Sequence, residues 1–464
     1  MTKQSPTRRL RGTLALVLVV NIVACVSTET RSAIDDLSQR TQRLTQSNEP
    51  AGDDRAAVDV GSLSSLVKTA VAADPRLRAM LAEVRGTLAL AQADGALPDA
   101  ELKAEVWGAP LFAPADLSRT DTLMIGPRQG FPALGADLDA RVRSRVADAD
   151  VAFENARRRA VDVAFEVTRA AVEVTTADVH VRLHDEHAAF LKELLVVQTQ
   201  QVAAGSAGTE EVLDTSVELA EIHVARARYA GQRQQARVAL NALLGVGGDD
   251  EVVVNLGSPP VAVGDGDALV KDLSARHPNV RGASAAIKKA AAERAVAEAD
   301  ATLPTLMVGA DYWWMPGEAG LDQHAYGVMA SISLPWLNGR HTHEVDAAEA
   351  MEARATLENT AVGREVARDV RTAQARLATA RTALAALNDD IAPLAQRAVD
   401  ANVVAYRGGR GSLLAVLRSA ERLLDVKMNR ATGEADVWLA AADVAHAAGT
   451  ALVPLGELGQ RRTS

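Results

Sequence analysis

The sequence contains one pattern twice, and this duplication constrains the fold more than any other feature. The matching segments are Leu66-Val67-Lys68 with Leu269-Val270-Lys271, Asp74-Pro75 with His277-Pro278, and Leu97-Pro98 with Leu303-Pro304. Solenoid repeats have periods of about 20–50 residues, and this repeat is much longer. We therefore expect two copies of one structural unit, at 62–245 and 267–449, with a linker at 246–266 and a tail at 450–464.

The N-terminus has the features of an export signal at residues 1–24. Four basic residues precede an apolar run at 13–24, which is too short to span a membrane as a helix. The run ends in Ile22-Val23-Ala24-Cys25, which resembles a bacterial lipobox and predicts lipidation of Cys25, the only cysteine. The alternative is an ordinary signal peptide that is cleaved nearby. Residues 25–61 are polar and predict a lipid-anchored tether.

Each repeat is predicted to contain a helix, a β-hairpin, a very long helix and a return helix. The hairpins fall at about 101–133 and 305–336, where apolar residues alternate with small or polar ones. In the second hairpin the strands have the length of about 9–11 residues that a tilted transmembrane strand needs. Four strands cannot close a membrane barrel, because the smallest known ones have about 8. Copies of the chain would have to pool their strands. The alternative is a soluble β-patch with a tryptophan core.

The long helices carry apolar residues at alternating spacings of four and three, which is typical of coiled-coil packing. One stripe runs from Val142 to Val181. The other runs from Val366 through Leu387, Ile391 and Leu394 to Ala405. Unbroken to Ala204, the first helix would be about 100 Å long at about 1.5 Å per residue.

Six aromatic residues lie in or beside the predicted strands, and aromatic rings favour the two rims of a membrane barrel. We predict that they form an aromatic girdle. They are Trp107, Tyr312, Trp313, Trp314, Tyr326 and Trp336.

In the order and doubling of its motifs, the chain resembles the TolC-like outer-membrane efflux proteins. The repeated motifs above carry the resemblance, together with Leu334-Pro335-Trp336-Leu337-Asn338-Gly339-Arg340 and Tyr406-x-x-Gly409-x-x-Ser412-x-x-x-Val416-Leu417. The resemblance implies a mainly α-helical chain with a small transmembrane β part. It also implies a homotrimer, with a 12-stranded β-barrel in the outer membrane of a Gram-negative bacterium and an α-helical barrel in the periplasm.

Such a protein is the passive exit duct of a tripartite efflux or secretion system. Its implied partners are a periplasmic adaptor, an inner-membrane pump of the RND or ABC type, and outer-membrane lipids. Met315-Pro316-Gly317 followed by Met329 resembles the heavy-metal-exporting branch, although methionine is often only apolar filler. Heavy metals and drugs are therefore both candidate cargo.

The turns after the long helices are predicted to form the periplasmic gate and the surface on which the adaptor docks. The residues are Gly205, Glu210, Glu211 and Asp214 in the first turn, and Tyr406, Arg407, Gly409, Arg410 and Arg418 in the second. The first turn is acidic and the second basic, so neighbouring turns could pair and close the aperture. Equally, these residues could simply be solvated, because an exposed ion pair contributes only about 0–1 kcal/mol.

Composition and motifs argue against other classes of protein. The net charge of −10 does not suit a nucleic-acid binder. We find no catalytic constellation and predict no enzyme, cofactor or metal site. His184 and His187 lack the His-Glu-x-x-His spacing of zinc enzymes, and His341 to Glu344 fit a solvated rim. Two rivals remain: a periplasmic adaptor or coiled-coil scaffold lipoprotein, which would have one helical hairpin, and a secreted helical enzyme.

Overall fold

The computed structural model describes most of the two repeats. The described residues are 26–46, 62–109, 111–112, 116, 119–205, 208–248, 250–259, 276–316, 323–337 and 339–452. The predicted signal peptide, Cys25 and most of the tail lie outside them, as do residues 260–275, which include the end of the inter-repeat linker and the start of the second repeat.

The chain forms two compact units, and several helices run from one unit into the other. The sheet unit comprises Met1–Asp35, Thr87–Val146 and Lys288–Glu352. The helical unit comprises Asp36–Gly86, Ala147–Ile287 and Ala353–Ser464. In the described ranges, no helix has the length and apolarity required to cross a membrane.

The sheet unit contains one antiparallel sheet, to which each repeat contributes a hairpin. Its strands are β1 (Glu101–Trp107), β2 (Thr122–Phe131), β3 (Leu306–Met315) and β4 (Gln323–Ile332), in the order β1-β2-β3-β4. The repeats meet where β2 pairs with β3, with Ile125 opposite Tyr312. The four predicted strands are thus confirmed. The outer edges of β1 and β4 have no partner strand among the described residues.

The register of the sheet separates an apolar face from a charged face. The apolar face consists of Leu102, Ala104, Val106, Leu123, Ile125, Pro127, Gln129, Phe131, Leu306, Val308, Ala310, Tyr312, Trp314, His324, Tyr326, Val328, Ala330 and Ile332. The residues between them form the charged face, which holds all five acidic and basic residues of the strands: Glu101, Lys103, Glu105, Arg128 and Asp311. The alternation seen in the sequence therefore corresponds to two chemically distinct surfaces.

The same register divides the residues of the predicted aromatic girdle between two faces of the sheet, and the girdle itself stays a prediction. Tyr312, Trp314 and Tyr326 lie on the apolar face, whereas Trp107 and Trp313 lie on the charged face. Successive residues of a strand point to opposite sides, so Trp313 cannot share a surface with its two neighbours. Trp336 lies outside the strands, in the 3₁₀ turn η4 (Pro335–Leu337), and is 56% exposed.

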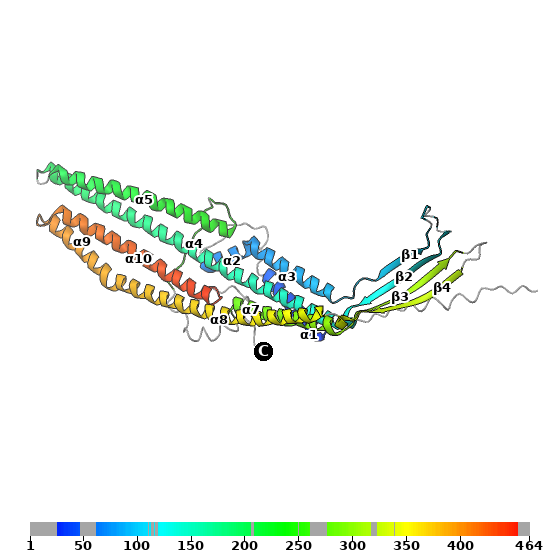
Figure 1. The fold of residues 1–464 in the computed structure, drawn as a ribbon. Coiled ribbons are helices and arrows are strands. Elements are labelled where there is room, and N and C mark those ends of the chain that lie inside the picture. The colour runs from blue at the N-terminus through cyan, green and yellow to red at the C-terminus, as the bar shows by residue number, and fades with distance from the viewer. Residues whose placement is uncertain are drawn as a thin grey trace, which may run out of the picture. The chain divides into compact units, whose positions relative to one another are not determined.

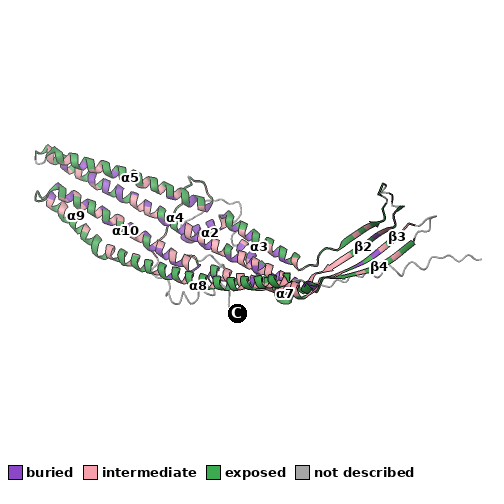
Figure 2. Ribbon diagram, in the orientation of Figure 1, coloured by how far each residue is buried: buried purple, intermediate pink, exposed green. Residues whose placement is uncertain are grey.

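The very long helices predicted from the sequence are present (Figure 1). In the first repeat, α4 (Asp137–Ala203) is followed by the return helix α5 (Thr209–Leu244). The second repeat has α8 (Arg340–Ala386), α9 (Ala392–Arg407) and the return helix α10 (Leu413–Ala447). In the helical unit, Leu183 and Leu191 of α4 pack with Ile222 of α5 and Leu424 of α10. α4 has buried residues along its length, whereas most of α8 is exposed in the single chain (Figure 2).

The helix expected at 62–96 is two helices, α2 (Leu63–Ala73) and α3 (Pro75–Asp94). Asp74 separates them because a residue before proline disfavours helical angles, and its ψ is 114°. The Asp74 carboxylate accepts a hydrogen bond from the Leu77 N–H at 2.8 Å. In the second repeat, α7 (Pro278–Thr302) begins in a similar way, with the Asn279 N–H donating to His277 Nδ1 at 3.1 Å. The repeated Asp-Pro and His-Pro pairs are therefore helix starts.

The tether predicted at 25–61 is wrong for its first part, because α1 (Thr28–Gln46) is a packed helix. Its buried side chains are Thr30, Ile34, Leu37, Thr41 and Leu44, again at spacings of four and three. In the helical unit, the Arg40 guanidinium lies 4.4 Å from the centre of the Phe153 ring and 3.1 Å from Glu154. Two threonines in the stripe make this helix look uniformly polar in the sequence.

The second predicted stripe coincides with the packed positions of the helix only as far as Leu387. Residues Leu387–Ile391 form a π-helical turn, which contains one residue more than an α-helical turn. Beyond this turn, Ile391 and Leu394 of the predicted stripe are 40% and 59% exposed. A packed residue follows each stripe position by one: Ala392, Ala395, Val399, Asn402 and Tyr406. Val403 and Ala405 are also half-buried. Pro393 has no N–H to donate in a regular helix, which explains the irregular turn just before it.

Candidate functional site

The turns that end the two long helices have corresponding glycines. Gly205 follows α4 with φ +69°, and Gly409 follows α9 with φ +70°, a left-handed conformation that glycine adopts at little cost. After Gly409, the Arg410 and Gly411 N–H groups both donate to the Ala405 carbonyl. Ser412 then caps α10 by accepting from the Ala415 N–H. The two turns thus share the left-handed glycine, whereas Gly208 provides no side-chain cap for α5.

Tyr406 connects the two turns within one chain. Its hydroxyl donates to Glu211 Oε2 at 2.7 Å and lies 3.1 Å from Gln201 Oε1. The ring is 8% exposed and packs with Leu413 and Val416. Burial, followed by the hydrogen bond to the Glu211 carboxylate, raises the pKa of the phenol to about 12. The hydroxyl therefore remains a donor at every physiological pH.

The other predicted turn residues are not brought together in the single chain. Glu210, Asp214, Arg407, Arg410 and Arg418 are exposed. Among the described residues, none of them forms an ion pair with a residue of the opposite turn. The charge pairing that we predicted between neighbouring turns concerns separate subunits, so it stays a prediction.

The sequence analysis missed three polar residues that lie inside the seam between the helices. Gln198 is fully buried and its amide donates to Thr215 Oγ1 at 2.9 Å. Gln201 lies one turn further along α4 and faces Tyr406. The available signal was that Gln198 and Gln201 continue the apolar stripe of α4 after Leu191 and Leu194. A polar residue at such a position requires a buried partner.

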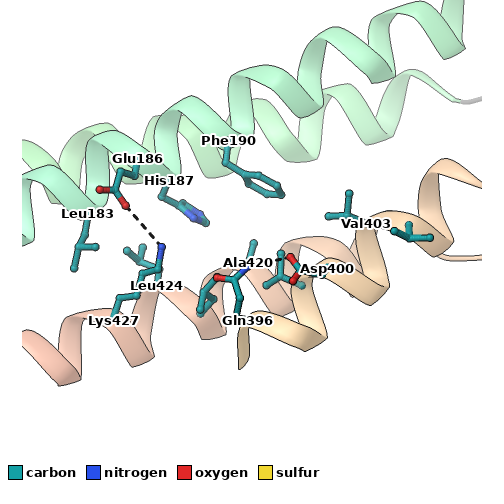
Figure 3. A pocket seen from close by; sticks show the side chains of 13 residues that line it. Leu183, Glu186, His187, Phe190, Gln396, Asp400, Val403, Ala420, Leu424 and Lys427 are labelled. Atoms are coloured by element: carbon teal, nitrogen blue, oxygen red, sulfur yellow. Dashed lines mark hydrogen bonds and ion pairs between the residues drawn. The ribbon is translucent and has the colours of Figure 1, made fainter. Parts of the chain in front are cut away.

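A groove of about 420 Å³ opens in the helical unit between α4 and the pair formed by α9 and α10 (Figure 3). Its walls are mainly apolar, with Phe190, Val403 and Leu424 among the lining side chains. Its polar residues are Glu186 and His187 of α4, Gln396 and Asp400 of α9, and Lys427 of α10. Lys427 Nζ lies 3.7 Å from Glu186, while Asp400 accepts from the Gln396 amide at 3.0 Å.

His187 is the ionisable residue of this groove whose protonation is most disfavoured. It is 9% exposed. Burial, and then the nearby charges of His184 and Lys427, lower the pKa of its imidazole to about 4. His187 is therefore neutral near pH 7.

The acidic and histidine residues at 184–187 have separate partners. The Nδ1–H group of His184 donates to the His180 carbonyl at 2.8 Å, and the His184 ring lies 4.9 Å from that of Tyr229. Asp185 pairs with Arg226, and Glu186 with Lys427. These four side chains do not converge on one point. In the described ranges, no group of three or more metal-ligating histidines or acidic residues occurs.

The charged face of the sheet is a second candidate site. Besides its five charges, it carries every methionine of the strands: Met124, Met307, Met315 and Met329. Gly126, Gly309 and Gly327 lie between them on the same face. A surface with charges, thioethers and glycines can contact water and ions, whereas the apolar face suits lipid or protein.

Comparisons with known proteins agree with this architecture. Residues 269–450 match the family model described as outer membrane efflux protein. The outer-membrane channel OprN is 17% identical with a TM-score of 0.69, covering 84% of this chain and 91% of OprN. The Vibrio cholerae outer membrane protein VceC is 17% identical with a TM-score of 0.64, covering 84% and 97%. The open state of the Neisseria gonorrhoeae outer membrane channel MtrE is 16% identical with a TM-score of 0.67, covering 87% and 94%.

A search of curated proteins by sequence finds no match. The sequence match covers the second repeat, and the structural matches extend over both repeats. Residues 269–450 thus carry an outer membrane efflux protein domain, and the fold of the chain is that of outer-membrane channels such as OprN and VceC.

Proposed function

We propose that the protein is the outer-membrane exit duct of a tripartite efflux or secretion system. The observation that carries this proposal is the four-stranded sheet, which has one apolar face, one charged face and two open edges. A sheet of this kind is explained if lipid covers the apolar face and water covers the charged face. Cargo would pass along the charged side, and no step of this function requires a catalytic residue or a cofactor.

Self-association accounts for the open edges. An unpaired strand edge tends to pair with another chain, and here β1 of one copy can pair with β4 of the next. Such a head-to-tail contact forms a ring when the rotation between neighbouring copies closes. Three copies of a four-stranded sheet supply twelve strands, enough for a membrane barrel. The homotrimer is therefore the smallest closed assembly that the family resemblance and this sheet both support.

The helical unit supplies a second reason to expect neighbours. α5 packs on α4 through Ile222, and its Leu240 is also buried. It also carries a separate stripe at spacings of four and three that is exposed in the single chain. This stripe consists of Leu213, Val217, Ala220, Val224, Ala227, Gly231, Gln234 and Val238. Such a stripe is typical of a coiled-coil contact, and in a trimer it would face the next subunit.

Cys25 would add a lipid anchor in the outer membrane, while α4, α5, α8, α9 and α10 would extend into the periplasm. A single acyl chain binds a membrane only marginally, so the sheet would supply most of the attachment. Substitution Cys25→Ser is expected to abolish incorporation of labelled fatty acid and to slow membrane delivery. Absence of label in the wild-type protein would exclude lipidation.

The turns at 205–211 and 407–415 would face an inner-membrane pump of the RND or ABC type and its periplasmic adaptor. The exposed acidic and basic residues there would pair between subunits and narrow the aperture. The Tyr406–Glu211 hydrogen bond would hold the two hairpins of each chain together. Glu211→Arg is therefore expected to raise single-channel conductance at low salt, and Arg418→Glu in the same chain to restore it in part.

Between heavy metals and drugs, the charged face favours soft metal ions as cargo. All four strand methionines lie on it and none on the apolar face. Thioethers are soft ligands that select ions such as Cu(I), and a filler role would have suited the apolar face equally well. Loss of the gene should then lower tolerance to silver or copper salts more than tolerance to lipophilic drugs. An unchanged metal tolerance would reject this cargo.

Assembly and conductance test the proposal directly. The purified full-length protein in mild detergent should have the mass of a trimer and form channels in planar lipid bilayers. A monodisperse monomer that stays soluble without detergent would reject the exit duct. The rival adaptor or scaffold lipoprotein was expected to have one helical hairpin, whereas this chain has two, α4–α5 and α9–α10. A protein that binds an inner-membrane pump but forms no channel would support that rival.

A further inference from the structure

Glycines on the charged face allow two ionised side chains to lie flat on the sheet. A Cβ atom at Gly126 would lie 2.5 Å from Asp311 Oδ1 and 2.1 Å from the Ala310 carbonyl oxygen. A Cβ atom at Gly309 would lie 3.0 Å from Arg128 Cγ. The side chains of Asp311 and Arg128 therefore occupy the space above these glycines.

Arg128 and Asp311 face each other across β2 and β3. Arg128 Nη2 lies 3.8 Å from Asp311 Oδ1, and the two side chains are 12% and 6% exposed. Asp311 Oδ1 and Arg128 Nε have no hydrogen-bond partner among the described residues. The pair is thus held by charge rather than by a matched set of hydrogen bonds, and each side chain keeps an unused polar atom.

This pair provides the only Asp, Glu, Lys or Arg side chains of three of the four strands. Arg128 is the only such residue of β2 and Asp311 the only one of β3, and β4 has none. The remaining charges of the sheet lie on β1, where Lys103 pairs with Glu105. One positive and one negative group therefore cancel within the part of the charged face that β2, β3 and β4 form.

We propose that Arg128 and Asp311 determine the ion selectivity of the conduit inside the membrane. This inference rests on the proposed function, in which the charged face lines the lumen. Three Arg128–Asp311 pairs then form a band without net charge, and ions of either sign can pass it. Arg128 is the specificity-determining residue. Its three copies in a trimer cancel the charge of the three Asp311 carboxylates, which would otherwise attract cations and repel anions.

The experiment measures reversal potentials of the full-length protein in planar bilayers under a KCl gradient. Arg128→Gln should raise the K⁺/Cl⁻ permeability ratio by a factor on the order of five, because one unit charge met at about 4 Å in water is equivalent to about 1 kcal/mol. Asp311→Asn should shift the ratio in the opposite direction. The double variant should return close to the wild-type value, and Arg128→Lys, which keeps the charge, should remain there.

A charge that is added chemically after the channel has assembled cannot disturb folding. Asp311→Cys leaves Arg128 unbalanced, and a negatively charged thiol reagent added to open channels should restore the wild-type ratio. A positively charged reagent should increase the anion preference. Reversal potentials that are equal in wild type and Arg128→Gln channels of normal conductance would overturn the inference. A wild-type protein that forms no channels would refute the proposed function, and this inference with it.

Discussion

We expect acidification to loosen the contact between α4 and α10 through His187. This imidazole lies in the groove between α4, α9 and α10 (Figure 3). Burial, and then the charges of His184 and Lys427, disfavour a positive charge on it. Glu186 is paired with Lys427, and Asp400 with the Gln396 amide. In the described groove, no carboxylate is among the groups that shift the pKa of His187.

The pKa shift sets the size and direction of the effect. The pKa of His187 is lowered from 6.5 to about 4 in the folded chain. A lowered pKa means that the unfolded chain binds more protons, so stability is complete above about pH 6.5 and is lost as the pH falls toward 4. At pH 5, this single group is expected to reduce the free energy of unfolding by about 2 kcal/mol.

Amide hydrogen exchange of the trimer at pH 7 and pH 5, corrected for intrinsic rates, would measure this effect locally. Peptides covering 183–191 and 420–428 should lose protection at pH 5 in the wild type but not in His187→Gln. His277 is an internal control because its pKa is also lowered to about 4, mainly by burial and then by Arg158. Peptides at the start of α7 should respond to pH in both proteins. Equal loss of protection at 183–191 with and without His187 would refute the reasoning.

Two further substitutions test contacts in the helical unit. Tyr406→Phe removes the hydrogen bond to the Glu211 carboxylate, which is worth about 1.5–3 kcal/mol. Single-channel conductance should rise in Tyr406→Phe. The control Tyr229→Phe, which lies away from the turns, should leave the conductance unchanged. Equal conductance in the wild type and both variants would contradict a gating role for Tyr406. Glu154→Gln leaves the guanidinium groups of Arg40, Arg157 and Arg281 without their shared carboxylate, at a cost of about 3–5 kcal/mol. Hydrogen exchange in 28–46 should increase, and an unchanged α1 would contradict this role for Glu154.

The order of elements could be predicted from the sequence because local signals and the duplication agreed. Alternation with a period of two identified all four strands, and the 3.5-residue stripe identified α4 and α8. The pairing of β2 with β3 could not be read from either repeat alone, because it joins hairpins that are distant in sequence. Charge cancellation between Arg128 and Asp311 depends on that pairing and was equally invisible.

Failures in the sequence analysis share one physical cause, which is polar residues at packed positions. Thr30 and Thr41 hide the stripe of α1, and Gln198 and Gln201 interrupt that of α4. Threonine can satisfy its hydroxyl within the helix, as Thr41 does by donating to the Leu37 carbonyl at 2.8 Å. Glutamine instead needs a partner across the seam, so its burial marks contacts such as Gln198–Thr215. If these threonines and glutamines are counted as members of a stripe, the sequence predicts both the packed helix α1 and the full length of the α4 stripe.

The π-helical turn explains why the stripe of α8 changes phase, and it leads to one more prediction. After Leu387–Ile391, a packed residue lies one position later in the sequence than each position of the predicted stripe. The turn therefore accommodates one additional residue. If that residue is removed, a regular helix would present the same side chains to the seam, including Tyr406.

We therefore expect deletion of Asp390 to be tolerated in a Pro393→Ala background, which removes the proline that disfavours a regular helix there. Deletion of Ala398 in the same background is the matched control. It lies in the regular part of α9, so it should rotate the following residues by about 100° and move Tyr406 away from Glu211. Protection of residues 399–416 from hydrogen exchange should persist in the first deletion and fall in the second. If both deletions expose this segment equally, the turn is not an accommodated insertion, and the phase of α9 must be fixed by its contacts with α10 instead.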